Sequence, residues 1–283
     1  MTSRPPTSRS RCQADLAPQS WYAVLRAAAR KSVIRFLSAF SRMNSKKEWI
    51  ILPYYHYVLD DEKWGFAEQL KFMRQHGDFL TLDDAVAAMQ QPAGIGGRYF
   101  CVTFDDGFRN CFTNALPILV EHKCPAAFFV PTDYIGLEIE RDWDVLRAFY
   151  ERTAYRVPFD FLNWDQCRQM HAARMTIGSH TCSHPRLSEV SRAEAERQLR
   201  VSREVIEREL GHPCRHFSCT WGRPNIDFDV AVHPEMARQA GYVSFLTTQR
   251  GRNYPASSPL FVRRDHALAG DCVYVLRYFF SIE

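Results

Sequence analysis

Residues 99–107 read YFCVTFDDG, an apolar run typical of a buried strand, followed at once by two carboxylates, Asp105 and Asp106. Adjacent carboxylates are unfavourable unless something holds them, because like charges repel and burial penalises both. A metal ion on one of them would resolve this conflict and leave the other to act as a base. An Asp-Gly turn is the alternative interpretation, but sheet and barrel enzymes place their sites at the carboxyl ends of strands.

Short apolar runs alternate with longer amphipathic segments from residue 48 onward. Strands are predicted at 49–55, 99–104, 126–130, 174–178, 216–219, 242–247 and 260–263. Helices are predicted at 65–76, 82–90, 112–122, 142–152, 164–172, 191–210 and 234–240. Ser191 and Glu194 have the spacing of a capping box, and Gly211 is suited to end that helix. This alternation predicts an α/β fold built on a parallel sheet or barrel.

A second polar motif, residues 178–185 (GSHTCSHP), follows another predicted strand. Its histidines, His180 and His184, have a spacing that suits metal ligands. Pro185 disfavours helical backbone at His184, so we expect the motif in a loop. With Asp106 the histidines would form a set of two imidazoles and one carboxylate. Such a set leaves positions open for water and substrate, as in catalytic metal sites.

These two motifs, in this order and each after a strand, resemble those of the polysaccharide deacetylase (NodB-homology) family, carbohydrate esterase family 4. Residues 103–107 (TFDDG) are similar to its first motif, and residues 180–184 (HTCSH) are similar to its H-[ST]-x-x-H motif. The resemblance extends over about residues 50–265 and includes Tyr55-His56 on the first predicted strand.

The resemblance implies a distorted (β/α) barrel of about seven strands. It also implies metal-dependent removal of N-acetyl groups from the amino sugars of a poly- or oligosaccharide, such as a chitooligosaccharide. By this resemblance Asp105 matches the catalytic base, while Asp106, His180 and His184 match the ligands of a divalent metal ion, usually Zn²⁺ in the family. The implied partner is an N-acetylated glycan.

Two later regions depart from the family's pattern. Residues 217–224 (FSCTWGRP) only partly match the motif that lines the groove, and we expect Arg223, Trp221 and His56 to bind substrate or to orient the base.

The late motif that supplies the general acid has no clean match. Arg264-Asp265-His266 follows the last predicted strand, and His266 is the candidate acid, with Asp265 as its candidate partner. Histidine is the commonest proton-transfer group in enzymes. A surface loop histidine is the alternative interpretation.

The first 47 residues differ from the rest in charge. Ten Lys or Arg and one acid give them a net charge of +9, which leaves −5 for residues 48–283. A mildly acidic main body is a poor candidate for nucleic-acid binding, which needs a basic face. We predict a basic extension over residues 1–46 and a deacetylase-like catalytic domain over 47–283. Residues 21–43 are predicted to form an amphipathic helix that either lies on an anionic membrane or packs on the domain.

Cysteine usage and hydropathy bear on the compartment. The nine cysteines form no CxxC pair and are odd in number, which favours reduced thiols. No uncharged apolar run approaches the roughly 18 residues of a membrane span. Arg35 interrupts the stretch that would serve as a signal peptide. We therefore expect a cytoplasmic protein, located at the inner membrane surface if the N-terminal helix binds lipid.

Three functions remain open at this stage, and deacetylation leads. Deformylation of a lipid-linked amino sugar, an activity the family also includes, would suit a membrane-bound N-terminus. A non-catalytic glycan-binding relative would explain the incomplete late motifs, although metal binding alone does not need Asp105. Metal content and acetate release from chitooligosaccharides would separate these functions.

Overall fold

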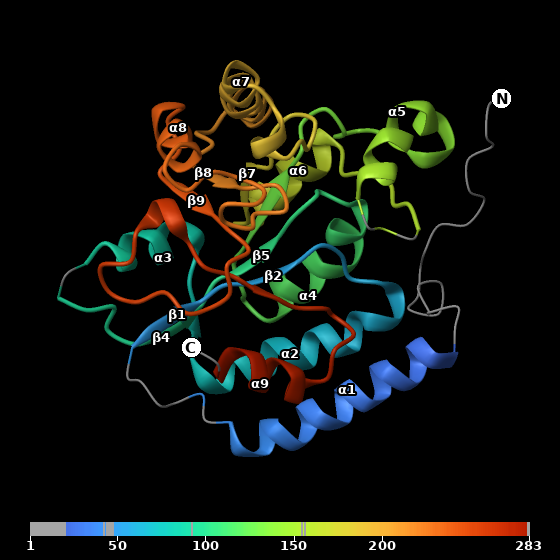
Figure 1. Ribbon diagram of the computed structural model, residues 1–283, viewed down its shortest axis with the longest axis vertical. Coiled ribbons are helices and arrows are strands. Elements are labelled where there is room, and N and C mark those ends of the chain that lie inside the picture. Colours follow the sequence, from blue (N-terminus) through green and yellow to red (C-terminus); the bar gives the residue numbers. More distant parts are fainter. Residues whose placement is uncertain are drawn as a thin grey trace.

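A curled sheet of seven parallel strands forms the centre of the molecule (Figure 1). The computed structural model describes residues 21–41, 43, 48–91, 93–153, 155 and 157–281. In spatial order the strands are β10 (Asp265–His266), β2 (Pro53–Tyr55), β5 (Val102–Phe104), β6 (Ala126–Val130), β7 (Thr176–Ser179), β8 (His216–Ser218) and β9 (Ser244–Leu246). The predicted (β/α) barrel of about seven strands is confirmed, as an open, half-closed barrel.

A smaller parallel sheet lies beside the first and explains two differences from the predicted strands. Its order is β1 (Trp49–Ile51), β4 (Arg98–Phe100) and β3 (Asp78–Phe79). The runs 49–55 and 99–104, each predicted as one strand, are both interrupted by a single residue. Their first halves pair in the small sheet and their second halves pair in the large one.

Strand β6 shows how the sheet is buried on both faces. All five of its residues are buried, as expected for a parallel strand covered on both sides. Successive side chains of a strand point to opposite faces. Phe128 belongs to the main core cluster, which also contains helix residues such as Leu119 and Met170. Phe129 packs on the other face, with a cluster that includes Leu246 and Leu82.

Helices cover the large sheet from outside. In chain order they are α1 (Trp21–Phe40), α2 (Lys63–His76), α3 (Leu82–Met89), α4 (Leu116–Glu121), α5 (Ile139–Arg152), α6 (Trp164–Ala172), α7 (Arg192–Leu210), α8 (His233–Gln239) and α9 (Val273–Ser281). Short turns of 3-10 helix stand at η2 (Asp60–Glu62), η4 (Leu187–Glu189) and η5 (Pro259–Phe261), and a π-helical turn, η3 (Cys111–Ala115), leads into α4. Figure 1 shows α1, α9 and α2 side by side at one edge.

The end of the chain differs most from the prediction. Residues 260–263 were predicted as a strand, but Pro259 starts a 3-10 turn there and the strand β10 follows at Asp265. Val262 still donates its backbone N–H to the Phe245 carbonyl at 3.0 Å, so only a single bridge remains where a strand was predicted. Helix α9, which no pattern had indicated, packs on α1 and α2.

Two further features concern the cysteines and the helices of the described residues. The structure describes eight of the cysteines; all are unpaired thiols, and seven of them are buried. Among the helices of the described residues, none combines the length and the apolar character that a bilayer crossing requires.

Helix α7 offers a test of the local signals that start a helix. Ser191 is its N-cap and accepts a hydrogen bond from the backbone N–H of Glu194 at 3.2 Å. We expect Ser191→Ala to lower the free energy of unfolding by about 1 kcal/mol, a loss of roughly 2–4 °C in Tm for a protein of this size. Ser191→Thr keeps the acceptor oxygen and should stay near the wild type in thermal unfolding. Equal losses in both variants would show that the cap does not stabilise the helix.

Candidate active site

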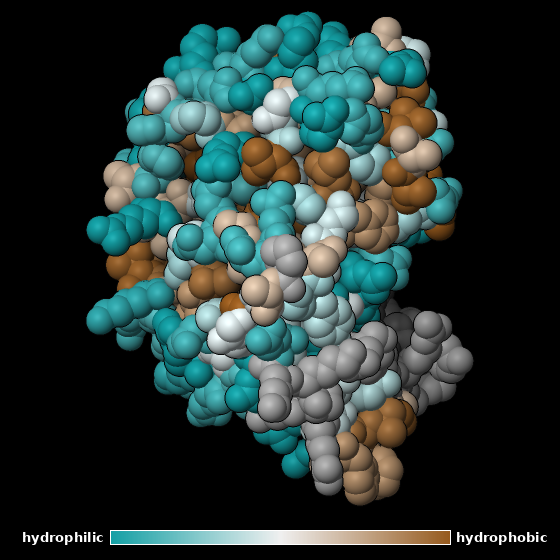
Figure 2. All heavy atoms as spheres, turned by 90° about the vertical axis from the view of Figure 1, so that its left-hand side faces the viewer, coloured by the Kyte–Doolittle hydropathy of each residue, from teal (hydrophilic) through white to brown (hydrophobic). Residues whose placement is uncertain are grey.

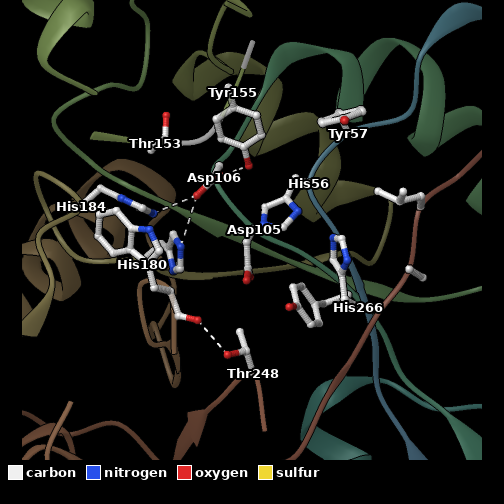
Figure 3. A pocket seen from close by; sticks show the side chains of 14 residues that line it. His56, Tyr57, Asp105, Asp106, Thr153, Tyr155, His180, His184, Thr248 and His266 are labelled. Atoms are coloured by element: carbon white, nitrogen blue, oxygen red, sulfur yellow. Dashed lines mark hydrogen bonds and ion pairs between the residues drawn. The ribbon is translucent and has the colours of Figure 1, made fainter. Parts of the chain in front are cut away.

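A pocket of about 400 Å³ opens where the strands of the large sheet end. Both carboxylates of the first motif, Asp105 and Asp106, line it directly after β5. Four histidines share the pocket; they are His56, His180, His184 and His266. Figure 3 shows His180 and His184 on one side of the carboxylates and His56 and His266 on the other. Parallel strands present their carboxyl ends at one edge, which is why motifs far apart in sequence meet here.

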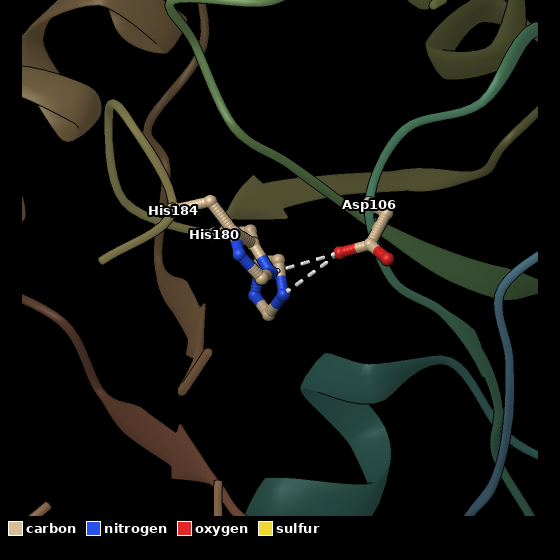
Figure 4. A group of neighbouring side chains, drawn as sticks. All are labelled: Asp106, His180 and His184. Carbon is tan, nitrogen blue, oxygen red and sulfur yellow. Dashed lines mark ion pairs between the residues drawn. The ribbon is translucent and has the colours of Figure 1, made fainter. Parts of the chain in front are cut away.

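Asp106, His180 and His184 form a buried cluster (Figure 4). The Nε2 atom of His180 lies 3.3 Å from Asp106 Oδ1, and Nε2 of His184 lies 3.1 Å from the same oxygen. The candidate ligand atoms all lie within 4.8 Å of one another. The structure therefore brings together the three residues that the motifs had indicated.

The backbone of both motifs adopts conformations that aim these side chains inward. Asp106 has φ of 70°, and in the second motif Thr181 and His184 have φ of 66° and 55°. Such left-handed backbone is uncommon outside glycine and persists only where surrounding contacts hold it. Here the Thr181 hydroxyl accepts a hydrogen bond from the backbone N–H of His184 at 3.0 Å. The second motif is thus a tight loop, as Pro185 had indicated.

Neighbouring groups orient the cluster. The Nδ1 atom of His180 lies 2.7 Å from the Ser218 carbonyl, so that its Nε2 faces Asp106. A backbone partner of this kind fixes the ring of a metal-binding histidine. The Tyr155 hydroxyl donates a hydrogen bond to Asp106 Oδ2. Burial and then the Asp106 charge raise the pKa of Tyr155, which keeps this hydroxyl protonated as a donor.

The donor set fits a divalent metal ion. Asp106 Oδ1 is buried, and no hydrogen bond of good geometry reaches it from the described residues, although two imidazole nitrogens face it. Burial favours protonation of Asp106, but His184 and His180 outweigh it and hold the pKa of Asp106 well below its usual range. A charged carboxylate beside two imidazoles is a typical zinc-binding set, and three protein ligands leave a position open.

Asp105 has a different partner. Arg264, which is fully buried, donates to Asp105 Oδ1 at 2.9 Å and to Oδ2 at 2.8 Å. Such a bidentate pair is among the strongest hydrogen-bonded contacts in proteins. Burial raises the pKa of Asp105, but the Arg264 guanidinium together with His180 outweighs that effect and leaves the pKa below its ordinary value. Asp105 is therefore held as a charged acceptor beside the ligand cluster.

Arg264 also corrects an expectation about Arg223. The side chain of Arg223 donates to Asp227, from Nε at 2.8 Å, and does not reach Asp105. The arginine that orients Asp105 is thus Arg264, and the expectation that Arg223 does so is wrong. A signal in the sequence could have found it: Arg264 stands two residues before His266, and alternate residues of a strand share a face.

His266 lies in the pocket on β10, but its expected pairing with Asp265 is wrong. Asp265 does not line the pocket and pairs with Arg250 Nε at 3.2 Å. The ring of His266 instead lies 5.5 Å from that of His56, measured between centroids. His266 is exposed to solvent. The protein around its ring and then the neighbouring His56 lower its pKa, which favours the neutral form.

Aromatic side chains form much of the wall. Trp221 and His56 both line the pocket, and the centroid of the Trp221 ring lies 4.5 Å from that of His184. Tyr54, Tyr57 and Tyr155 complete this aromatic lining. Tyr155 comes from the connection between β6 and β7, where no motif had indicated a site residue.

Comparison with known proteins places this site in context. A family model described as polysaccharide deacetylase matches residues 95–245, more than half of the chain. A chitooligosaccharide deacetylase of Sinorhizobium fredii is 30% identical over 115 residues, which are 40% of this chain. The match spans only 42% of that relative's length.

Solved structures show the same fold. IcaB from Ammonifex degensii superposes with a TM-score of 0.67 at 21% identity, over 84% of this chain and 99% of that one. The Streptococcus pyogenes deacetylase PplD, in complex with acetate, gives a TM-score of 0.64 at 20% identity, over 83% and 99%.

The ligand cluster leads to a prediction about metal content. We expect the purified protein to bind about one divalent ion per chain, and His184→Ala to lose most of it, because two ligands hold an ion much more weakly than three. Elemental analysis after dialysis measures the content. His266→Ala, which changes a pocket histidine outside the cluster, serves as the control and should keep the ion. Full metal content in His184→Ala would exclude His184 as a ligand.

Proposed function

The chain belongs to the polysaccharide deacetylase family, and from this premise we propose that it is a metal-dependent hydrolase. The proposed reaction removes N-acetyl groups from the amino sugars of a poly- or oligosaccharide, with chitooligosaccharides as the model substrate class. The proposed cofactor is Zn²⁺, held by Asp106, His180 and His184. The whole reaction cleaves the amide C–N bond with water and yields acetate and a free amine.

One observation carries this proposal: the two adjacent carboxylates have separate partners. Asp106 faces two imidazoles, whereas Asp105 is held by Arg264 at 2.9 and 2.8 Å. A protein that only bound a metal ion would not need a second buried carboxylate kept charged beside the ligands. This division supports one ligand and one general base.

Asp105 is suited to take a proton from the attacking water. Its carboxylate is charged, fixed in orientation by Arg264 and lines the same pocket as the cluster. A bound divalent ion would supply Lewis acidity toward the amide carbonyl and the water. The protein's own contribution is to hold the base at a fixed place, which saves the cost of orienting it during the reaction.

His266 is our candidate for proton transfer to the leaving amine. It lies across the pocket from His180 and His184, on the far side of Asp105 (Figure 3). A lowered pKa favours the neutral imidazole, which gives up a proton readily once it has gained one. This role requires that His266 receive the proton during the reaction.

The walls of the pocket suit a sugar ring. Trp221, Tyr54 and Tyr57 present aromatic surface, and the same pocket holds the two carboxylates and four histidines. Pockets of this composition bind small polar molecules by apolar contact and use a few polar groups to set orientation. PplD was solved in complex with acetate, the acid that the proposed reaction would release.

The first test is acetate release from N-acetylated chitooligosaccharides by the metal-loaded protein. Asp105→Asn should reduce the rate about 10²–10⁴-fold, the usual cost of losing a general base, while metal content stays at the wild-type level. Formate release from N-formylated amino sugars, measured in parallel, tests the deformylase alternative. Equal rates for Asp105→Asn and the wild type would contradict the assigned base. A metal-loaded wild type that releases neither acid would support the non-catalytic alternative.

A paired substitution tests which arginine orients the base. Arg264→Lys keeps a positive charge but loses the two-pronged contact with Asp105, so we expect the rate of acetate release to fall about 10²-fold. Metal content should not change. Arg223→Lys removes a similar contact with Asp227 and should have a far smaller effect on rate. The reverse order of effects would restore Arg223 as the orienting residue.

A further inference from the structure

One side of helix α1 packs on the domain, and another side carries apolar residues that the described part of the chain leaves uncovered. Ile34 and Ser38 are buried, and the helix packs along α9. The other face carries four large apolar side chains that solvent reaches. Their exposed fractions are 58% for Val33, 66% for Phe36, 39% for Leu37 and 72% for Phe40.

These four residues form a continuous stripe, which we call the α1 stripe. Their spacing of three, four and seven residues places them on one side of a helix. The rings of Phe36 and Phe40 touch, with centroids 5.2 Å apart. Figure 2 shows apolar atoms exposed at the lower end of the molecule, at the height of α1 in Figure 1.

A stripe of this kind needs a partner. Isolated apolar side chains are normal on a protein surface, such as Val120 on α4 or Val145 on α5. A contiguous group that includes two exposed phenylalanines instead marks an interaction surface. The charge of the surrounding sequence then decides what that partner is.

The stretch of sequence that contains the α1 stripe is strongly basic. Residues 26–47 contain seven Lys or Arg and no Asp or Glu; the basic residues are Arg26, Arg30, Lys31, Arg35, Arg42, Lys46 and Lys47. A second copy of the chain would bring two such segments together, and like charges would oppose that contact. Residues 1–20 offer few large apolar side chains, Met1 and Leu16, to cover the stripe.

We propose that the α1 stripe docks on the surface of an anionic lipid bilayer. Phenylalanine and leucine would enter the boundary between headgroups and acyl chains, and the basic residues would attract the negative surface. Because the stripe runs along the helix, α1 would lie in the plane of the membrane. Its other face, on α9, would hold the catalytic domain at that surface. The two alternatives predicted for this helix, binding to a membrane and packing on the domain, would then both apply, one on each face.

The test uses the purified full-length chain and vesicles, and it does not depend on the proposed reaction. We expect co-sedimentation with phosphatidylcholine vesicles that contain phosphatidylglycerol, and little with phosphatidylcholine alone. The double variant Phe36→Ser and Phe40→Ser should bind the anionic vesicles at least about tenfold more weakly than the wild type. Vesicle binding should also be weaker in 1 M salt than in a low-salt buffer, because the Debye length falls to about 3 Å at 1 M ionic strength.

The matched control is Val120→Ser combined with Val145→Ser, which removes two exposed apolar side chains from other helices. It should bind vesicles like the wild type. Circular dichroism and Tm verify that both double variants are folded. Equal vesicle binding by the phenylalanine variant and the wild type would overturn the proposal. So would a wild type that ignores anionic vesicles but sediments as a dimer that the phenylalanine variant breaks, because the stripe would then be an interface between two copies.

Discussion

Two adjacent buried carboxylates at the end of β5 are the constraint on which the rest of the structure depends. Asp105 needs Arg264, next to β10, and Asp106 faces histidines that follow β7. Both partner strands lie two positions from β5, on opposite sides. Neighbouring strands are spaced about 4.8 Å apart, so a flat sheet would hold these partners roughly 10 Å away. The curl of the sheet closes that distance from both directions.

The buried guanidinium of Arg264 shows how the fold and the site share one set of contacts. Besides Asp105, it donates to the Thr247 carbonyl and to the hydroxyls of Thr103 and Ser218. These acceptors follow or belong to β9, β5 and β8. Removing Asp105 would leave this guanidinium as an unpaired buried charge, at a cost of about 3–5 kcal/mol. The same contacts that tie the strand ends together therefore also keep the proposed base charged and fixed.

Two features of this protein lie outside the regular alternation of strands and helices. Tyr155, from the connection between β6 and β7, donates to Asp106 and so holds the carboxylate from the side opposite the histidines. Helix α1 precedes the first strand, packs on α9 and leaves the α1 stripe exposed. Both are additions at the periphery of the sheet, one next to the site and one on the outer surface.

The sequence by itself determined the class of fold and the group of Asp106, His180 and His184, because both depend on local patterns. Apolar runs define the strands, and motifs that directly follow parallel strands must meet at one edge. Only the tertiary structure decided that Arg264 and not Arg223 holds Asp105, that Asp265 turns to Arg250, and that Tyr155 reaches Asp106. These pairings depend on how far the sheet curls and on where the connection between β6 and β7 folds back toward the site. Contacts between distant segments set both. The spacing of Arg264 and His266 indicates a shared face, but it does not identify Asp105 as the partner of Arg264.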